Sequence, residues 1–362
     1  MVNERMRIWA EEEDKMDRNQ NGFRKGRLTM DNIGILINNI KESWGKGKIV
    51  MVAFVDVKSA YDNVNHEEII RRLREMGCPR RLGKYIDAWL RERKVEIRNV
   101  DGIVEGMREM EVRILQYADD IVIYVEIQDR REGKRKIEMA MSKLKGNLEN
   151  LGLGIATEKT QIVTYVGKRK RGRGGNEEFN IEGERIKGVG AAKFLGMWLD
   201  EALDFRRHTE YVVSKLKKRM NILKCIGGIR KGTEPETIIK IFKALIRSVV
   251  EYGGQFCIKD KRNREKVQKI HNAGIRIAMG YRLSIPINVM ETEAGIMDLE
   301  TRLETLVEGY VAGKFWMRDN EVIEAIENRI KYGVPEEIEE GRDMVVDGGR
   351  MEKIGREEGR NV

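Results

Sequence analysis

The chain has few of the residues that stabilise small secreted domains or bind transition metals. Of its 362 residues, three are cysteines, three are histidines and four are prolines. The widely separated Cys78, Cys225 and Cys257 provide neither a disulfide framework nor the paired spacing of a zinc site, so we expect them to be reduced. The histidines are equally scattered, and we assign none of them a ligand role. These absences argue against a disulfide scaffold and against a zinc module.

Long apolar runs are also lacking. No stretch approaches the roughly 20 apolar residues of a bilayer-spanning helix, and the first residues lack the apolar core of a signal peptide. Hydrophobic residues make up 41% of the chain and charged residues 36%, which is typical of a helix-rich, soluble protein of two or three domains. We therefore expect an intracellular protein without membrane association.

Positive charge is concentrated in one part of the chain. Residues 206–282 contain 20 Lys and Arg against 6 Asp and Glu, a net of +14, whereas residues 283–362 contain 10 against 19, a net of −9. The basic part suits a polyanion such as nucleic acid, because each cation placed near a phosphate releases condensed counterions. A merely solvated helical face is the alternative, and composition leaves both open.

Apolar periodicity predicts mixed helices and strands. Helices are expected over about 30–45, 68–76, 81–91 and 137–151, and almost continuously from residue 208. Strands are expected over 49–55, 95–100, 112–116, 121–125, 159–166 and 194–199, with a short hairpin over 179–189. Thr29 or Asp31 is expected to cap the first helix. A basic linker occupies residues 168–175, and residues 341–362 are expected to be disordered.

Two acidic patterns indicate the chemistry. Ile49–Val55 is a near-continuous apolar run, typical of a strand covered on both faces, and Asp56 follows it directly. Asp119 and Asp120 lie between two predicted strands, at the tip of a hairpin. A carboxylate at the end of a buried strand is costly unless it is paired or holds a metal. An Ala-Asp-Asp turn alone is usually a solvent-facing turn, but three carboxylates at adjacent strand ends suit two Mg²⁺ ions and phosphoryl transfer.

In this order the motifs resemble those of the reverse transcriptases of non-LTR (LINE-type) retrotransposons, over roughly Gln20 to Trp316. The segment from Phe54-Val55-Asp56 through Ala60-Tyr61-Asp62 looks like the first catalytic motif of that family. The segment Tyr117-Ala118-Asp119-Asp120 looks like the second. The fingers motif is similar to Gln20-Asn21-Gly22-Phe23-Arg24. The segment that follows the catalytic hairpin is similar to Gly152-Leu153-Gly154 with Glu158-Lys159-Thr160, and the primer-grip hairpin is similar to Phe194-Leu195-Gly196.

The resemblance implies an α+β fold, with a reverse-transcriptase-like palm of antiparallel sheet and packed helices plus partial fingers, followed by a helical thumb and a helical C-terminal region. The expected boundaries are 1–19 for a charged N-terminal segment, 20–205 for partial fingers and palm, 206–258 for a basic thumb-like region, 259–325 for the helical C-terminal region and 326–362 for an acidic, disordered tail. The implied activity is RNA-directed DNA polymerisation, and the implied partners are an RNA template, a DNA primer and deoxynucleoside triphosphates. Nuclear residence follows from the same likeness, with the basic linker in support.

By this resemblance Asp56 and Asp119 bind Mg²⁺, with Asp120 beside them. Tyr61 would lie under the incoming sugar and reject a 2′-hydroxyl by steric clash, and the alternative is an ordinary core aromatic. Lys159 would protonate the departing pyrophosphate, a role that a desolvated lysine can fill, and the alternative is a surface lysine at a strand start.

Three more residues are assigned to substrate binding by the same likeness. Arg24 would contact the template or the triphosphate, although a loop arginine is more often simply solvated. Phe194 and Leu195 would position the primer end, yet the same residues would pack a hairpin in any protein.

The sequence departs from the family between the two catalytic motifs. Only 63 positions separate Asp56 from Asp119, and the Gly-Pro-Gln-Gly type loop and apolar helix expected there are missing. The amino terminus also looks short, without the upstream part of the fingers. Because misplacement by about 1 Å can cost on the order of 100-fold in rate, loss of a pocket element argues against efficient polymerisation.

Two other readings therefore stay open. One is a catalytically dead element fragment that at most binds nucleic acid, and a gene prediction that dropped coding sequence would look the same. The other is a basic helical interaction protein with an incidental acidic hairpin, in which Asp56 and Asp119 would lie far apart.

Overall fold

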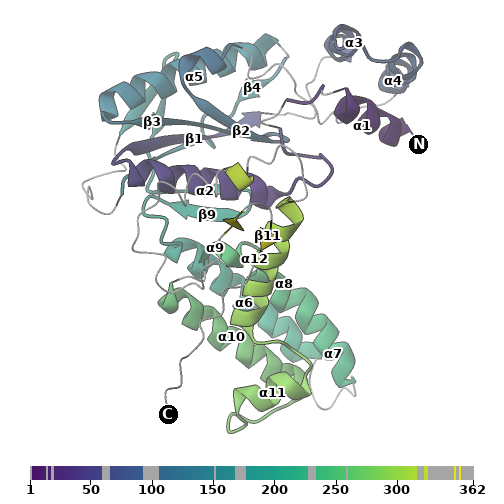
Figure 1. The fold of residues 1–362 in the computed structure, drawn as a ribbon, viewed down its shortest axis with the longest axis vertical. Helices are drawn as coiled ribbons and strands as arrows, with labels where there is room; N and C mark the ends of the chain where they lie inside the picture. The colour runs from purple at the N-terminus through teal and green to yellow at the C-terminus, as the bar shows by residue number, and fades with distance from the viewer. Residues whose placement is uncertain are drawn as a thin grey trace.

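The computed structural model of this chain combines helices with antiparallel sheets (Figure 1). It describes residues 2–13, 15–17, 20–58, 66–92, 106–150, 152–167, 177–226, 234–257, 260–315, 322–324, 346–347 and 350–351. The helices are α1 (Val2–Glu12), α2 (Thr29–Gly45), α3 (His66–Glu75), α4 (Arg80–Glu92), α5 (Arg130–Asn150), α6 (Arg206–Ile226), α7 (Pro235–Phe242), α8 (Ser248–Glu251), α9 (Gly254–Cys257), α10 (Lys261–Met279), α11 (Ile287–Glu293) and α12 (Leu299–Phe315), with a 3₁₀ turn η1 (Arg108–Met110) and a π-helical turn η4 (Lys243–Arg247).

The strands are β1 (Ile49–Lys58), β2 (Arg113–Tyr117), β3 (Asp120–Ile127), β4 (Gly154–Ile155), β5 (Gln161–Tyr165), β6 (Glu178–Ile181), β7 (Glu184–Lys187), β8 (Ala191–Phe194), β9 (Met197–Asp200), β10 (Val346–Asp347) and β11 (Arg350–Met351). The main sheet has the order β2, β3, β1, β4, and β5 also pairs with β1. Every pair in it is antiparallel. The expected α+β class with an antiparallel sheet is confirmed.

Strand β1 is the centre of the main sheet and explains why its apolar run is continuous. All residues from Ile49 to Val55 are buried, because helices cover both faces (Figure 1). Val52 belongs to the core shared with Leu36 of α2, and Met51 to the core shared with Met141 of α5. The prediction of a strand covered on both faces is therefore confirmed.

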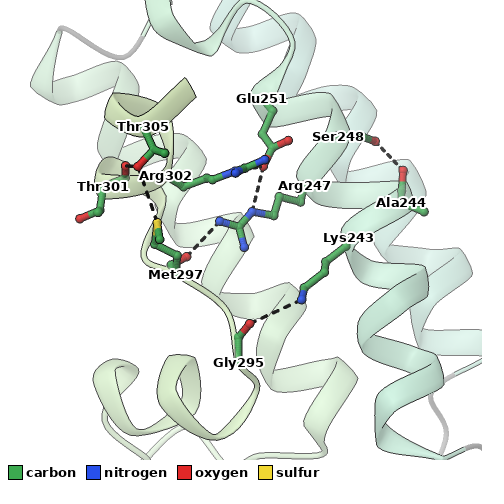
Figure 2. A network of polar contacts seen from close by, with 10 residues as sticks. All are labelled: Lys243, Ala244, Arg247, Ser248, Glu251, Gly295, Met297, Thr301, Arg302 and Thr305. Carbon is green, nitrogen blue, oxygen red and sulfur yellow. Dashed lines mark hydrogen bonds and ion pairs between the residues drawn. The ribbon is translucent and has the colours of Figure 1, made fainter. Parts of the chain in front are cut away.

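Helix α12 connects the helical region to the start of α2. Near its beginning, Arg302 Nε donates to Glu251 Oε1 at 2.8 Å, and the same oxygen accepts from Arg247 Nε at 3.0 Å (Figure 2). Near its end, Lys314 Nζ lies 2.6 Å from Asp31 Oδ2. Segments nearly 300 positions apart in sequence are thus held together by charged groups.

The expected single strand over residues 194–199 is wrong. The segment folds into the hairpin of β8 and β9, whose two turn residues are Leu195 and Gly196. Both turn residues have positive φ, 44° and 84°, as in the type I′ turns that match the twist of paired strands. An apolar leucine at the first turn position conceals this turn, because Asn or Asp usually stands there.

Two helix starts also differ from the prediction. Neither Thr29 nor Asp31 occupies the N-cap of α2, which is Leu28. Asp31 instead acts from within the first turn, where its carboxylate accepts from the Leu28 N–H at 2.8 Å. Helix α5 begins at Arg130, before the expected Ile137, because its first turns are polar and carry no apolar periodicity.

Several expectations fall on residues outside the described part of the chain. These are the strand over 95–100, the basic linker over 168–175, Tyr61, and all of the tail except β10 and β11. Within the described part, Cys78, Cys225 and Cys257 are free thiols, as expected. None of the described helices combines the length and the apolar content that a bilayer-crossing segment needs.

Candidate active site

The strand register brings the acidic patterns together at one edge of the main sheet. Asp56 in β1 is directly opposite Asp120, the first residue of β3. Asp120 in turn pairs with Tyr117 of β2, which leaves Ala118 and Asp119 as a two-residue turn. Three carboxylates therefore lie at adjacent strand ends. A reading in which Asp56 and this hairpin are far apart does not agree with this register.

The carboxylates are close enough to influence one another. Burial raises the pKa of Asp120 to about 6, and the charges of Asp119 and Asp56 add to the increase. Oxygen donors that carry excess negative charge are the ligands that Mg²⁺ prefers, so the donor set fits this ion in kind. Among the described residues, however, no three His, Cys, Asp or Glu side chains converge as a ready metal site. A shared ion would require the carboxylates to turn toward one another.

Lys159 lies beside Asp56. Its Nζ is 3.5 Å from Asp56 Oδ2, and 68% of its side chain is exposed. The backbone explains this placement, because β4 pairs with the end of β1 and the Ala156 N–H donates to the Asp56 carbonyl at 2.9 Å. The Lys159 N–H then donates to the Ala156 carbonyl at 3.0 Å. An exposed ammonium group thus lies next to the acidic edge.

The hairpin of β8 and β9 approaches the same edge. Phe194 is only 2% exposed and packs its ring 5.6 Å from that of Phe54, so it belongs to the core. Leu195 is at the turn, and its carbonyl accepts from the Tyr252 hydroxyl. Burial raises the pKa of Tyr117, and the neighbouring Tyr252 adds to the increase. Of the two expected primer contacts, Phe194 is buried in the core and Leu195 is partly buried at the turn of this hairpin.

Arg24 stabilises its own loop. One guanidinium nitrogen lies 3.3 Å from the Asp17 carbonyl and 3.4 Å from the Gln20 carbonyl. Its proposed contact with template or triphosphate stays a prediction, as does the role of Tyr61, which is outside the described residues.

The loop that begins at Gln20 contacts the acidic turn, a feature that sequence reasoning missed. Gln20 Oε1 accepts from the Gly22 N–H at 2.8 Å and from the Ala118 N–H at 3.1 Å. The Asn21 N–H donates to the Gln116 carbonyl at 2.9 Å. Gln20 and Ala118 are 98 positions apart in the sequence, and the spacing of residues along the chain does not predict a contact over that distance.

A basic–aromatic patch, made of Lys193, Trp198, Arg207, Tyr211 and Lys215, covers the hairpin and the start of α6. Lys193 Nζ and Lys215 Nζ lie 5.1 and 4.6 Å from the centroid of the Tyr211 ring, and Arg207 Cζ lies 3.9 Å from that of Trp198. Hydrogen bonds from Lys215 and then Lys193 lower the pKa of Tyr211. Within the described residues, none of the three cations pairs with a carboxylate. Such cations are available to bind an anionic partner.

The basic surface continues along α6. A groove of about 420 Å³ opens between α6 and α10, and Lys217, Lys218, Lys224 and Lys269 line it. Part of the positive charge of residues 206–282 therefore lines one groove between two helices.

Comparison with known proteins shows which family this chain resembles. The sequence model of "Reverse transcriptase (RNA-dependent DNA polymerase)" matches residues 1–108, which include Asp56. The Pol polyprotein of the R1 retrotransposable element of Nasonia vitripennis is 23% identical over 243 residues, covering 61% of this chain and 67% of that protein. The chain is therefore similar to the reverse transcriptases of non-LTR retrotransposons over the residues that these comparisons match.

Other relatives of this chain are matched over a smaller share of their length. A putative 115 kDa protein of element R1DM from Drosophila melanogaster is 25% identical over 268 residues, covering 65% of this chain and 25% of that protein. The RNA-directed DNA polymerase of mobile element jockey from Drosophila melanogaster is 20% identical over 327 residues, covering 81% and 35%. The chain thus spans a quarter to about a third of these two relatives. Apo telomerase from Candida tropicalis aligns over 90% of this chain and 60% of that chain, at 12% identity and a TM-score of 0.38, which is too low to establish a common fold.

Proposed function

We propose that this chain performs RNA-directed DNA synthesis at the acidic edge of its main sheet. The observation that carries the proposal is the register that sets Asp56 opposite Asp120, beside the turn that bears Asp119. Asp56 and Asp119 would hold Mg²⁺, with Asp120 next to them. Mg²⁺ bound there would supply a Lewis acid for the transfer of a nucleotidyl group from a deoxynucleoside triphosphate.

The neighbouring residues would act on the primer and on the leaving group. Lys159, next to Asp56, would give a proton from Nζ to the departing pyrophosphate. Leu195, at the hairpin turn, would position the primer end, with Phe194 holding that hairpin on the core. Tyr61 would exclude a 2′-hydroxyl, and Arg24 would contact template or triphosphate after release from its loop carbonyls.

The domain roles follow from this assignment. Residues 20–205 would form partial fingers and palm, 206–258 the thumb-like region and 259–325 the helical C-terminal region, between a charged segment over 1–19 and an acidic tail over 326–362. The basic–aromatic patch supports a path for primer and template, because cations contact phosphates and aromatic rings stack on bases. A nuclear location fits a family that copies RNA into DNA.

The decisive test is primer extension. We expect the purified protein to extend a DNA primer on an RNA template when Mg²⁺ and deoxynucleoside triphosphates are present, and Asp119→Ala to abolish incorporation, because it removes a metal ligand. Glu149→Ala, which removes an exposed carboxylate of α5, serves as the matched control and should leave incorporation unchanged. Equal incorporation by wild type and Asp119→Ala would contradict the assignment.

Nucleic-acid binding without catalysis is the second candidate. Two observations favour it: only 63 positions separate Asp56 from Asp119, and the acidic side chains of the described residues do not converge as a metal site. No incorporation by the wild type, together with retained binding of primer and template, would select this candidate.

Both candidates predict that the basic–aromatic patch contacts phosphates. Replacing Lys193 and Lys215 together by glutamine is expected to reduce the slope of log affinity against log salt by about 2, or about 1 per lysine. Fluorescence anisotropy of a labelled primer–template over a salt series measures this slope. Lys84→Gln on α4 changes the net charge at an exposed lysine outside the patch, and a slope that falls as much in this variant would exclude the patch as the binding surface.

A further inference from the structure

We propose that Gln20 is a positioning residue for the acidic turn, and that its side-chain amide fixes where Asp119 and Asp120 lie relative to Asp56. The catalytic consequence of this inference rests on the proposed function. The contact itself does not, because it joins two segments of the chain that can be observed without any substrate.

The first argument is the fate of one buried N–H group. Ala118 is the first residue of a two-residue turn, so its N–H points away from the ladder of β2 and β3. Ala118 is only 6% exposed, and a buried backbone donor needs a partner. Gln20 Oε1 provides it at 3.1 Å and also accepts from Gly22 at 2.8 Å. Because both neighbours are donors, the amide oxygen rather than the NH₂ group must face the turn.

The second argument is the conformation of the turn. Ala118 has φ of +58°, a region that non-glycine residues seldom occupy and that persists when surrounding contacts impose it. The loop lies directly against it, since a Cβ placed on Gly22 would be 2.5 Å from the Ala118 nitrogen. Gly22 thus permits a close approach that holds the turn in this form.

The third argument is that the loop is itself anchored. Asn21 Nδ2 donates to Asn32 Oδ1 on α2, and Lys314 Nζ of α12 donates to the Gly26 carbonyl at 2.7 Å. Gln20 is 1% exposed, so its amide belongs to the interior. The support under the turn is therefore tied to two helices, and Gln20 transmits their position to Asp119.

The mechanism predicts separate effects on turnover and on binding. Loss of the Gln20 contact lets the turn relax and displaces two of the three carboxylates, which lowers the rate of chemistry. The basic–aromatic patch is built on β8, β9 and α6, so affinity for primer and template should remain unchanged. We therefore expect loss of the Gln20 contact to lower kcat and to leave the KM for primer–template unchanged.

Amide hydrogen exchange tests the contact independently of activity. In the full chain, the Ala118 and Gly22 amides should be protected, and Gln20→Leu should speed their exchange by about tenfold or more, as loss of one hydrogen bond predicts. Gln20→Glu keeps an acceptor oxygen and should restore protection. Gln268→Leu removes an amide that donates to Asn272 within α10 and should leave both amides unchanged.

The outcomes separate the two proposals. Unprotected Ala118 and Gly22 amides in the wild type overturn the inference even if Gln20→Leu does not fold, and so do equal rates in Gln20→Leu and the wild type. Restored protection in Gln20→Glu, with fast exchange in Gln20→Leu, supports it. If these exchange results hold while the wild type fails to extend a primer, the proposed function fails and the positioning of the turn stands.

Discussion

Lys314→Met is expected to lower the free energy of unfolding by about 3–5 kcal/mol, because it breaks a buried ion pair with Asp31. Its side chain is 4% exposed and the Asp31 side chain is fully buried, with 2.6 Å between Nζ and Oδ2. Methionine fills a similar volume but leaves the Asp31 carboxylate without its ion-pair partner in the interior. Urea unfolding, with the midpoint and the slope fitted together, measures the loss.

Two controls distinguish an uncompensated charge from lost packing. The double variant Asp31→Asn with Lys314→Met should be more stable than Lys314→Met alone, because the amide removes the buried charge and can still accept from the Tyr310 hydroxyl. Lys134→Met breaks an exposed pair with Glu138 and should cost less than about 1 kcal/mol. If Lys314→Met were as mild as Lys134→Met, the pair would not be the link between α12 and α2 that we infer.

The central strand of the main sheet could be predicted because a continuous apolar run indicates a strand that is buried on both faces. Ile49–Val55 is apolar without interruption, and the structure buries each of these residues between α2 and α5. Strand assignment puts Asp56 near the end of β1 and Asp119 and Asp120 at the tip of the β2–β3 hairpin, and the observed pairing of β1 with β3 brings Asp56 and Asp120 opposite each other. The candidate carboxylates therefore follow from strand assignment, whereas their pairing depends on the register of β1 on β3.

What supports those carboxylates could not be predicted in the same way. The contact of Gln20 with Ala118 spans 98 positions, and that of Lys314 with Asp31 spans 283. Neither residue type signals its burial, because glutamine and lysine are usually exposed. One feature of the sequence does indicate that Lys314 is buried. It lies in the mostly apolar segment 311–315, whereas a surface helix carries polar residues along its whole outer face.

The β8–β9 hairpin was concealed by its own sequence. Leu195 continues an apolar run, so the sequence pattern does not mark it as a turn residue. In the structure it has a positive φ, and its carbonyl accepts a hydrogen bond from the distant Tyr252 hydroxyl. The basic–aromatic patch was concealed with it, since Lys193 and Trp198 are cross-strand partners only when the turn exists. The resemblance indicated a primer-grip hairpin at Phe194-Leu195-Gly196, but apolar periodicity indicated a single strand, so the patch that the turn assembles was not predicted.

Acidification is expected to destabilise the fold through His208. This side chain is 2% exposed, and its Nδ1 accepts from the Trp198 N–H at 3.2 Å, so it must be unprotonated. Burial, with Lys215 and Lys193 adding to it, lowers the pKa of His208 from 6.5 to about 4. Between these two values the unfolded chain binds a proton at His208 that the folded chain does not, so the contribution of His208 to stability is constant above about pH 6.5 and falls as pH decreases toward 4. The full difference is about 3 kcal/mol at 1.36 kcal/mol per pKa unit.

His208→Asn tests this origin, because an amide oxygen can accept from Trp198 and does not titrate. His271, whose pKa burial also lowers to about 4, contributes with the same sign, and Asp120, whose pKa is raised to about 6, contributes with the opposite sign. The variant should therefore lose only the His208 part of the acid-induced decrease, so its decrease should be smaller than that of the wild type. Urea midpoints at about pH 7.5 and about pH 4.5 measure both decreases, and an equal decrease in variant and wild type would contradict the role of His208. Because Trp198 also carries Arg207 on its ring, protonation of His208 would displace part of the basic–aromatic patch. Primer–template affinity should therefore fall together with stability in the wild type and remain higher in His208→Asn.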